Sequence, residues 1–124
     1  MAAPIGPYTP IVRAGDLLIC SGQIGFAHDG VLVDGGVMAQ VTQAIRNIAA
    51  LLDTQGAKLT DVVKTLVLLV DISDFPDMNE AYAAAFGDHR PARSAFAVNA
   101  LPAGALVEIE AWAFKPLGSV ESAG

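Results

Sequence analysis

Hydrophobic and polar residues follow one another along the first half of the chain in a pattern that predicts two strands and a helix. Two short apolar segments, 11–13 and 17–21, flank turn residues around Gly15, which indicates a β-hairpin. After a glycine-rich loop over residues 25–36, apolar residues recur at three- and four-residue spacing until Gly56, as in an amphipathic helix. The stripe consists of Val37, Val41, Ala44, Ile45, Ile48 and Leu52.

The next stretch predicts a buried strand followed by a second helix. Residues 62–70 are β-branched and apolar at odd and even positions alike, which is typical of a central strand covered on both faces. Ser73 or Asp74 is expected to cap the helix that follows, and Gly87 to end it. Its apolar stripe consists of Phe75, Met78, Tyr82 and Phe86.

Two further strands, over residues 92–98 and 106–114, complete a ββαβαββ order. This order predicts an α/β (α+β) fold in which both helices lie on one face of a sheet. We expect a single domain over residues 1–124, with a core of about 5–115 and a flexible tail over 116–124. Because the central strand is apolar on both sides, the second face of the sheet also needs cover.

Composition indicates what that cover is. Hydrophobic residues make up 53% of the 124 residues and charged residues 16%, compared with roughly 25% charged in an average soluble domain. No apolar run approaches the roughly 20 residues of a membrane-spanning helix, so no membrane partner is expected. Burial between identical subunits is the better explanation.

The charge pattern disfavours nucleic acid as a partner. The net charge is −6, and the seven basic residues are scattered along the chain instead of being clustered. The amino-terminal segment lacks the basic start and apolar stretch of a secretory signal, so a cytoplasmic location is expected.

Metal and cofactor chemistry are not indicated either. Cys20 is the only cysteine and lies in an apolar run, where it is interpreted as a core residue. His28 and His89 have no partners at metal-ligand spacing. The sequence also contains no phosphate loop, dinucleotide fingerprint or Ser-His-Asp set, so we expect neither metal nor cofactor.

Arg93 is the first candidate for ligand binding. Strand alternation puts it on one face with Ala95 and Ala97, and Ser94 and Phe96 on the other. A guanidinium above a floor of small side chains leaves room for a ligand, and its fork geometry suits a carboxylate or phosphate. An ordinary surface or interface ion pair is the alternative, and these residues alone leave both open.

Glu108 is the candidate for proton transfer. It shares a strand face with Glu110 and Trp112, and the two carboxylates lie about 6 to 7 Å apart at strand spacing. In a dry pocket the pKa of such a glutamate rises, and it could exchange protons with water or a reacting nitrogen. The alternative is a solvated strand edge.

Four weaker candidates are Tyr8, before the first strand, Ser21 and Gly22, after the second, and Asn79, beside the stripe of the second helix. Each residue alone is uninformative, because turns are rich in such residues and a solvated asparagine is common.

Taken in order, five segments resemble the RidA (YjgF) family of reactive intermediate deaminases. The match runs from Ile5 to about Phe114. The resemblance implies a chorismate-mutase-like fold and a homotrimer, whose sheets form a central barrel and whose ligand sites lie between subunits. The segments are Ile5-Gly6-Pro7-Tyr8, Ser21-Gly22-Gln23-Ile24, Asp74-Phe75 to Asn79, Pro91-Ala92-Arg93-Ser94 and Glu108-Ile109-Glu110-Ala111.

The same resemblance implies an activity, the hydrolysis of 2-imino or enamine acids of the 2-aminoacrylate type to 2-oxo acids and ammonia. Arg93 would hold the substrate carboxylate and Glu108 would position or activate water. Backbone N–H groups near Ala95 and Gly22 would assist. Tyr8, Ser21 and Asn79 match positions that line or shape the cleft.

The chain departs from the family pattern at three places near the implied cleft. Ala95 stands where family members often carry cysteine, Ala97 where they often carry an acid, and Gly25-Phe26 where proline commonly follows Ser-Gly-Gln-Ile. These departures keep two alternatives open: a paralogue that acts on a longer enamine, and a trimer that binds a metabolite or partner without catalysis.

Overall fold

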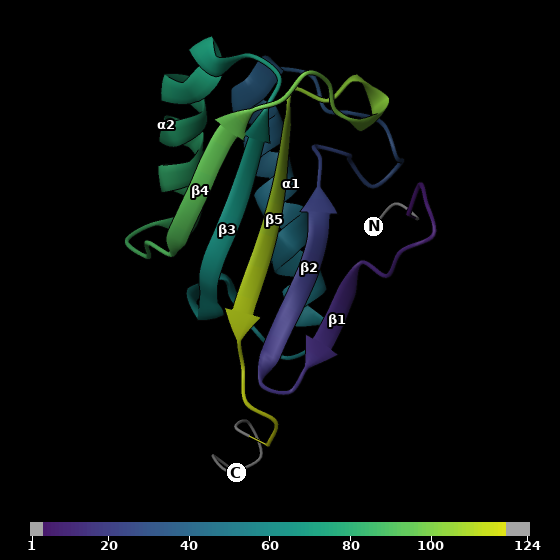
Figure 1. Ribbon diagram of the computed structural model, residues 1–124, viewed down its shortest axis with the longest axis vertical. Helices are drawn as coiled ribbons and strands as arrows, with labels where there is room; N and C mark the ends of the chain where they lie inside the picture. The colour runs from purple at the N-terminus through teal and green to yellow at the C-terminus, as the bar shows by residue number, and fades with distance from the viewer. Residues whose placement is uncertain (1–3, 119–124) are drawn as a thin grey trace.

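The alternating and helical sequence patterns become five strands and two helices in the computed structural model, which describes residues 4–118. The strands form one sheet in the order β1-β2-β5-β3-β4, with α1 behind it and α2 beside β4 at the left (Figure 1). The elements are β1 (Ile11–Ala14), β2 (Leu17–Gln23), α1 (Gly36–Asp53), β3 (Val62–Leu69), α2 (Phe75–Phe86), β4 (Ala92–Ala97) and β5 (Val107–Phe114). The predicted ββαβαββ order is therefore confirmed.

Pairing between strands explains this arrangement. β1 and β2 form an antiparallel hairpin around Gly15, whose φ of 60° suits a residue without a side chain. β5 inserts between β2 and β3 and runs antiparallel to both, whereas β3 and β4 are parallel and joined through α2. The strand over residues 62–70 is thus interior, as predicted, although β5 occupies the middle of the sheet.

The two apolar helix stripes meet the sheet as predicted. In α1 the stripe residues are buried, and one polar side chain, Gln40, is buried with them. In α2 Met78, Tyr82 and Phe86 are buried, and the Tyr82 hydroxyl shares a 2.7 Å hydrogen bond with Thr65 of β3. That bond satisfies two polar groups inside the core.

The expected cap of the second helix was wrong in detail. Asp74 stands at the N-cap position without a side-chain hydrogen bond. Instead the carboxylate of Asp71 accepts hydrogen bonds from the backbone N–H and hydroxyl of Ser73, because a short 3₁₀ turn precedes the helix. Gly87, with a φ of 65°, ends the helix as predicted.

Cys20 belongs to the core, as interpreted from the sequence. Its side chain is fully buried, and burial raises the pKa of its thiol to about 11. A thiol that stays protonated at neutral pH is not a nucleophile.

Only one face of the sheet is covered within a single chain. On β5 the odd-numbered residues from Val107 to Ala113 are buried under the helices, while Trp112 and Phe114 are exposed on the other face. Phe96 of β4 is also half exposed, at 50%. The expectation that β3 is covered on both sides is not met by one chain, and cover by further subunits stays a prediction.

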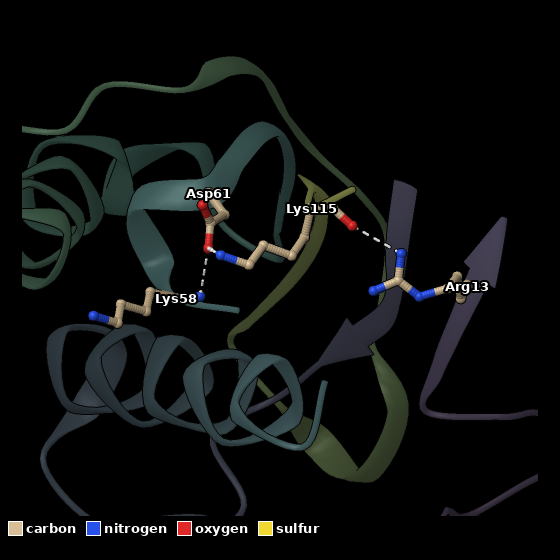
Figure 2. A network of polar contacts seen from close by, with 4 residues as sticks. All are labelled: Arg13, Lys58, Asp61 and Lys115. Atoms are coloured by element: carbon tan, nitrogen blue, oxygen red, sulfur yellow. Dashed lines mark hydrogen bonds and ion pairs between the residues drawn. The ribbon is translucent and has the colours of Figure 1, made fainter. Parts of the chain in front are cut away.

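A polar network holds the carboxyl end of β5 to the hairpin and to the turn before β3 (Figure 2). Arg13 donates a 2.8 Å hydrogen bond to the carbonyl of Lys115, whose ammonium lies 4.0 Å from the carboxylate of Asp61. Asp61 also accepts a 2.8 Å hydrogen bond from the backbone N–H of Lys58. The described chain is therefore anchored as far as Lys115. Of the expected flexible tail, residues 119–124 lie outside the described residues.

Across residues 4–118, neither helix combines the length and apolar character that crossing a membrane requires.

Candidate functional site

A pocket of about 290 Å³ lies where the amino-terminal segment passes the end of β2. Four of the candidates from the sequence line it, namely Tyr8, Ser21, Gly22 and Glu108. The rest of its lining is largely apolar and consists of Pro4, Ile5, Pro10, Gln23, Ile24, Phe26, Asn47 and Pro102. Chain segments far apart in the sequence thus gather around one glutamate.

A β-bulge shapes the floor of this pocket. Cys20 pairs with Ala111 and Gln23 with Ile109, so β2 carries one residue more than β5 between these pairs. The extra length falls at Ser21 and Gly22. Gly22 lies against Glu108 so closely that a Cβ atom at position 22 would be 2.8 Å from the carboxyl carbon of Glu108.

Glu108 lies in the pocket and has a raised pKa. Burial raises the pKa of its carboxyl, and the nearby charge of Glu110 raises it further. Glu110 itself accepts a 3.1 Å hydrogen bond from the indole N–H of Trp112. A half-buried carboxyl with a raised pKa is a stronger proton acceptor than an ordinary glutamate, which suits it to general acid–base chemistry.

Ser21 has a supporting position in the pocket. Its hydroxyl donates a 2.7 Å hydrogen bond to the carbonyl of Thr9, and its backbone N–H donates to the carbonyl of Pro10 at 2.8 Å. Both bonds hold the segment that carries Tyr8, a residue that is 44% exposed and lines the pocket. Ser21 therefore fixes the segment that presents Tyr8.

Arg93 lies on a different surface, at the edge strand β4. Its guanidinium carbon is 5.0 Å from the ring centroid of Tyr82 and 5.6 Å from that of Phe75, and one of its N–H groups points to the sulfur of Met78 at 3.7 Å. Ala95 shares this strand face with Arg93, as expected, but α2 also covers the face and presents its aromatic rings to Arg93. Cation–π contacts of this kind stabilise a guanidinium without neutralising it.

Within residues 4–118 no carboxylate lies within ion-pairing distance of Arg93. The alternative of an ordinary ion pair on the surface of the chain therefore fails for the described residues. The charge remains available to an anionic ligand or to another subunit.

Asn79 and Ala95 accompany Arg93 instead of Glu108. Asn79 follows Met78 on α2, and its side-chain oxygen is buried with no hydrogen-bond partner in the described part of the chain. Ala95 lies on the same strand face as Arg93 and packs against the core. A buried acceptor without a donor carries a cost of about 1–3 kcal/mol, so Asn79 has a hydrogen-bonding capacity that the described residues do not use.

The candidate residues thus divide into two groups on opposite faces of the sheet. Arg93 pairs in register with Thr65, which faces the helices, whereas Glu108 pairs with Leu68, which faces the open side. Because neighbours across a sheet share a face, one chain does not bring Arg93 and Glu108 together. We define Tyr8, Ser21, Gly22 and Glu108 as the glutamate group, and Asn79, Arg93 and Ala95 as the arginine group.

The histidines take no part in either group. A ring nitrogen of His89 lies 2.7 Å from the carbonyl of Val62, which ties the loop after α2 to the start of β3. In the described ranges no three His, Cys, Asp or Glu side chains gather in a way that could hold a metal ion.

Sequence reasoning missed several pocket residues. Phe26 was noted only as a departure from a family pattern, and Ile24, Asn47 and Pro102 were not singled out for the pocket. Asn47 sits beside the apolar stripe of α1, and nothing in its spacing distinguishes it from a solvated asparagine.

Comparison with known proteins places these features in context. The family model described as endoribonuclease L-PSP matches residues 1–115. The human 2-iminobutanoate/2-iminopropanoate deaminase is 46% identical over 112 residues, which cover 90% of this chain and 82% of the human protein.

Two solved structures are similar in fold as well as in sequence. The crystal structure of RidA from an Antarctic Psychrobacter species has a TM-score of 0.86 and 41% identity, and the match covers 90% of this chain and 91% of that one. The E. coli TdcF structure with bound serine has a TM-score of 0.85 and 33% identity, with the same two coverages.

Proposed function

Because the chain belongs to the RidA (YjgF) family, we propose that it hydrolyses reactive 2-imino and enamine acids of the 2-aminoacrylate type to 2-oxo acids and ammonia. An identity of 46% to a deaminase of 2-iminobutanoate and 2-iminopropanoate supports this class of reaction. The serine bound to a relative supports a small amino-acid-like ligand that carries a carboxylate. The proposed site of action is the cytoplasm.

One observation carries the proposal for the site. Within residues 4–118 the guanidinium of Arg93 has no ion-pair partner, and Glu108, whose pKa is raised, lies in a pocket on another surface. We propose that a homotrimer joins the arginine group of one subunit to the glutamate group of the next. The exposed apolar residues Phe96, Trp112 and Phe114 on the open sheet face support burial between subunits.

In this proposal Arg93 binds the substrate carboxylate through two N–H groups, and its contacts with the rings of α2 hold the fork in place. Fixed in this way, the imine carbon lies next to the water that Glu108 positions. Orientation is a large share of what such a reaction needs, because imines already hydrolyse in water.

In the proposed reaction Glu108 carries out the proton transfers. As water adds to the imine carbon, one of its protons passes to the Glu108 carboxylate, which delivers it to the imine nitrogen and leaves an adduct with one hydroxyl and one amino group. Glu108 then accepts the proton of that hydroxyl and delivers it to the amino nitrogen, the C–N bond breaks with its electron pair on nitrogen, and ammonia leaves as the C=O bond of the 2-oxo acid forms. A pKa raised toward neutrality lets one carboxyl perform both transfers.

The test is kinetic. The protein is added to a serine or threonine dehydratase reaction, which releases the enamine, and the appearance of ammonia and 2-oxo acid is followed. We expect faster release with the protein than without it. Equal rates over a range of protein concentrations would overturn the proposal.

A second function is favoured by one feature, the absence of a thiol at Ala95 in the arginine group. In this second function the protein would be a non-catalytic trimer that binds a 2-oxo acid without turning over an imine. Calorimetric binding of 2-oxobutanoate, combined with no acceleration of imine hydrolysis, would identify this function.

The description endoribonuclease attached to the family model raises RNA as a substrate. The net charge of −6 and the scattered basic residues argue against this activity here. We expect no RNA binding even at low salt, where electrostatic attraction is strongest.

A further inference from the structure

The apolar side of the pocket is a loop that runs over residues 24–33 between β2 and α1. The backbone N–H of Phe26 donates to the carbonyl of Ile24 at 2.8 Å, which makes a tight turn. Phe26 also pairs with Leu32 across the loop, and the N–H of Val33 donates to the carbonyl of Gly25 at 3.0 Å. Ile24 and Phe26 line the pocket.

A single side chain of α1 fastens this loop. The amide nitrogen of Asn47 donates to the carbonyl of Ile24 at 3.2 Å and to that of Phe26 at 3.0 Å. The amide nitrogen of Gln43, one helical turn earlier, donates to the side-chain oxygen of Asn47 at 3.0 Å. Both N–H donors of Asn47 are thus engaged. The orientation of the amide is also determined, because a flipped amide would place the side-chain oxygen of Asn47 next to two carbonyl oxygens, with which it cannot form a hydrogen bond.

Close packing reinforces the clamp. A Cβ atom at Gly25 would lie 2.8 Å from the Cα of Gln40, so the loop rests directly on the backbone of α1. Gln40 in turn accepts a 2.9 Å hydrogen bond from the backbone N–H of Leu106, after the turn that carries Pro102 of the pocket. Gln40, Gln43 and Asn47 follow one another at three- and four-residue spacing, so one face of α1 supports two walls of the pocket.

We propose that Asn47 is a positioning residue of the pocket, which fixes the Ile24–Phe26 wall and thereby sets the size of the ligand side chain that the site accepts. Asn47 lines the pocket but has no N–H group left for a ligand, so it acts through the loop. The inference rests on the proposed function in one respect, namely that the pocket receives the side chain of a 2-oxo or 2-imino acid.

The experiment compares two probes of different side-chain size, 2-oxobutanoate and 4-methyl-2-oxopentanoate. Calorimetry on the full-length protein gives the ratio of their dissociation constants. In Asn47→Ala we expect this ratio to change by about threefold to tenfold, because burying one methylene group changes an affinity by about fourfold. Where turnover is measurable, the change should appear in KM for the larger substrate more than in kcat.

Two further variants keep the inference testable if Asn47→Ala folds poorly. Gly25→Ala pushes the loop off α1 and should change the ratio in the same direction. Gln43→Ala removes only the bond that orients Asn47 and should have a smaller effect. Ile48→Val is the matched control, because it trims a fully buried side chain of the same helix that lies outside the pocket lining. It should lower the melting temperature and leave the ratio unchanged.

The two possible failures are distinguishable. Wild-type protein that binds both probes, with a ratio that is the same in Asn47→Ala and Gly25→Ala, overturns the role of Asn47 and leaves the proposed function standing. Wild-type protein that binds neither probe overturns the proposed function and this inference together.

Discussion

Glu108 rests against the bare backbone of Gly22, and a single added carbon at position 22 would meet its carboxyl group at 2.8 Å. Burial and the charge of Glu110 raise the pKa of Glu108, and a side chain at position 22 would have to displace the carboxyl from its observed position. Glycine is thus required at position 22 because the carboxyl group of Glu108, 86 residues later in the chain, occupies the space that a side chain would need.

Gly22→Ala should therefore reduce imine hydrolysis by about tenfold to a hundredfold, because general acid–base catalysis contributes at least that much. Steady-state kinetics with a dehydratase-generated substrate measure the effect. Gly15→Ala is the control for destabilisation alone. Its φ of 60° costs about 1 kcal/mol with a side chain, but it lies at the hairpin turn away from the pocket. Wild-type turnover in Gly22→Ala would contradict the proposed role of Glu108.

The pH dependence of stability follows from the direction of the same pKa shift. Burial and the charge of Glu110 raise the pKa of Glu108 above its ordinary value of 4.5, so the folded state favours the protonated carboxyl. This contribution is fully present below the pKa of the unfolded chain and is lost as pH rises through the folded pKa. Ionised Glu108 therefore destabilises the native protein at neutral pH.

Glu108→Gln, which stays neutral, should raise Tm at pH 7 and change it little below about pH 4. Thermal denaturation at the two pH values measures the difference. Glu80→Gln, at an exposed position on α2, serves as the control and should show no such gain. A Glu108→Gln protein that is less stable than wild type at pH 7 would mean that the ionised carboxylate is stabilised by a group that one chain does not show.

Arg93 should decide the affinity for carboxylates. Arg93→Ala is expected to weaken binding of 2-oxobutanoate by about tenfold to a hundredfold, since hydrogen bonds to charged groups are worth about 1.5–3 kcal/mol. Arg93→Lys keeps the charge but loses the fork, so it should be intermediate. Calorimetry measures both, with Arg46→Ala, an exposed arginine of α1, as the control. Equal affinity in Arg93→Ala and Arg46→Ala would exclude Arg93 from the site.

Because Arg93 and Glu108 lie on opposite faces of the sheet, we expect two inactive variants to complement each other when their chains are mixed. Arg93→Ala and Glu108→Gln should each be inactive alone, yet chains of the two kinds co-expressed in equal amounts should recover about a quarter of wild-type activity. In the proposed trimer each shared site would take its arginine and its glutamate from different subunits, and each of these residues is intact in half of the chains. Light scattering on the same samples should give the mass of a trimer. No recovery, in mixtures shown to contain both chains, would contradict a site shared between subunits.

The sequence by itself determined which residues share a face. Strand alternation put Arg93 with Ala95, and Glu108 with Glu110 and Trp112, and the structure confirms both sets. The helix stripes were equally readable. These properties are local, because the periods of two and 3.6 residues follow from backbone geometry that every segment carries within itself.

Only the tertiary structure decided which segments are neighbours. The insertion of β5 between β2 and β3 brings Glu108 to Gly22 and leaves Arg93 at the far edge against the rings of α2. The bulge in β2 and the two carbonyl contacts of Asn47 likewise depend on chain segments far away in the sequence. Strand order and side-chain clamps depend on long-range pairing and burial, which no local period encodes, so they appear only when the whole chain has folded.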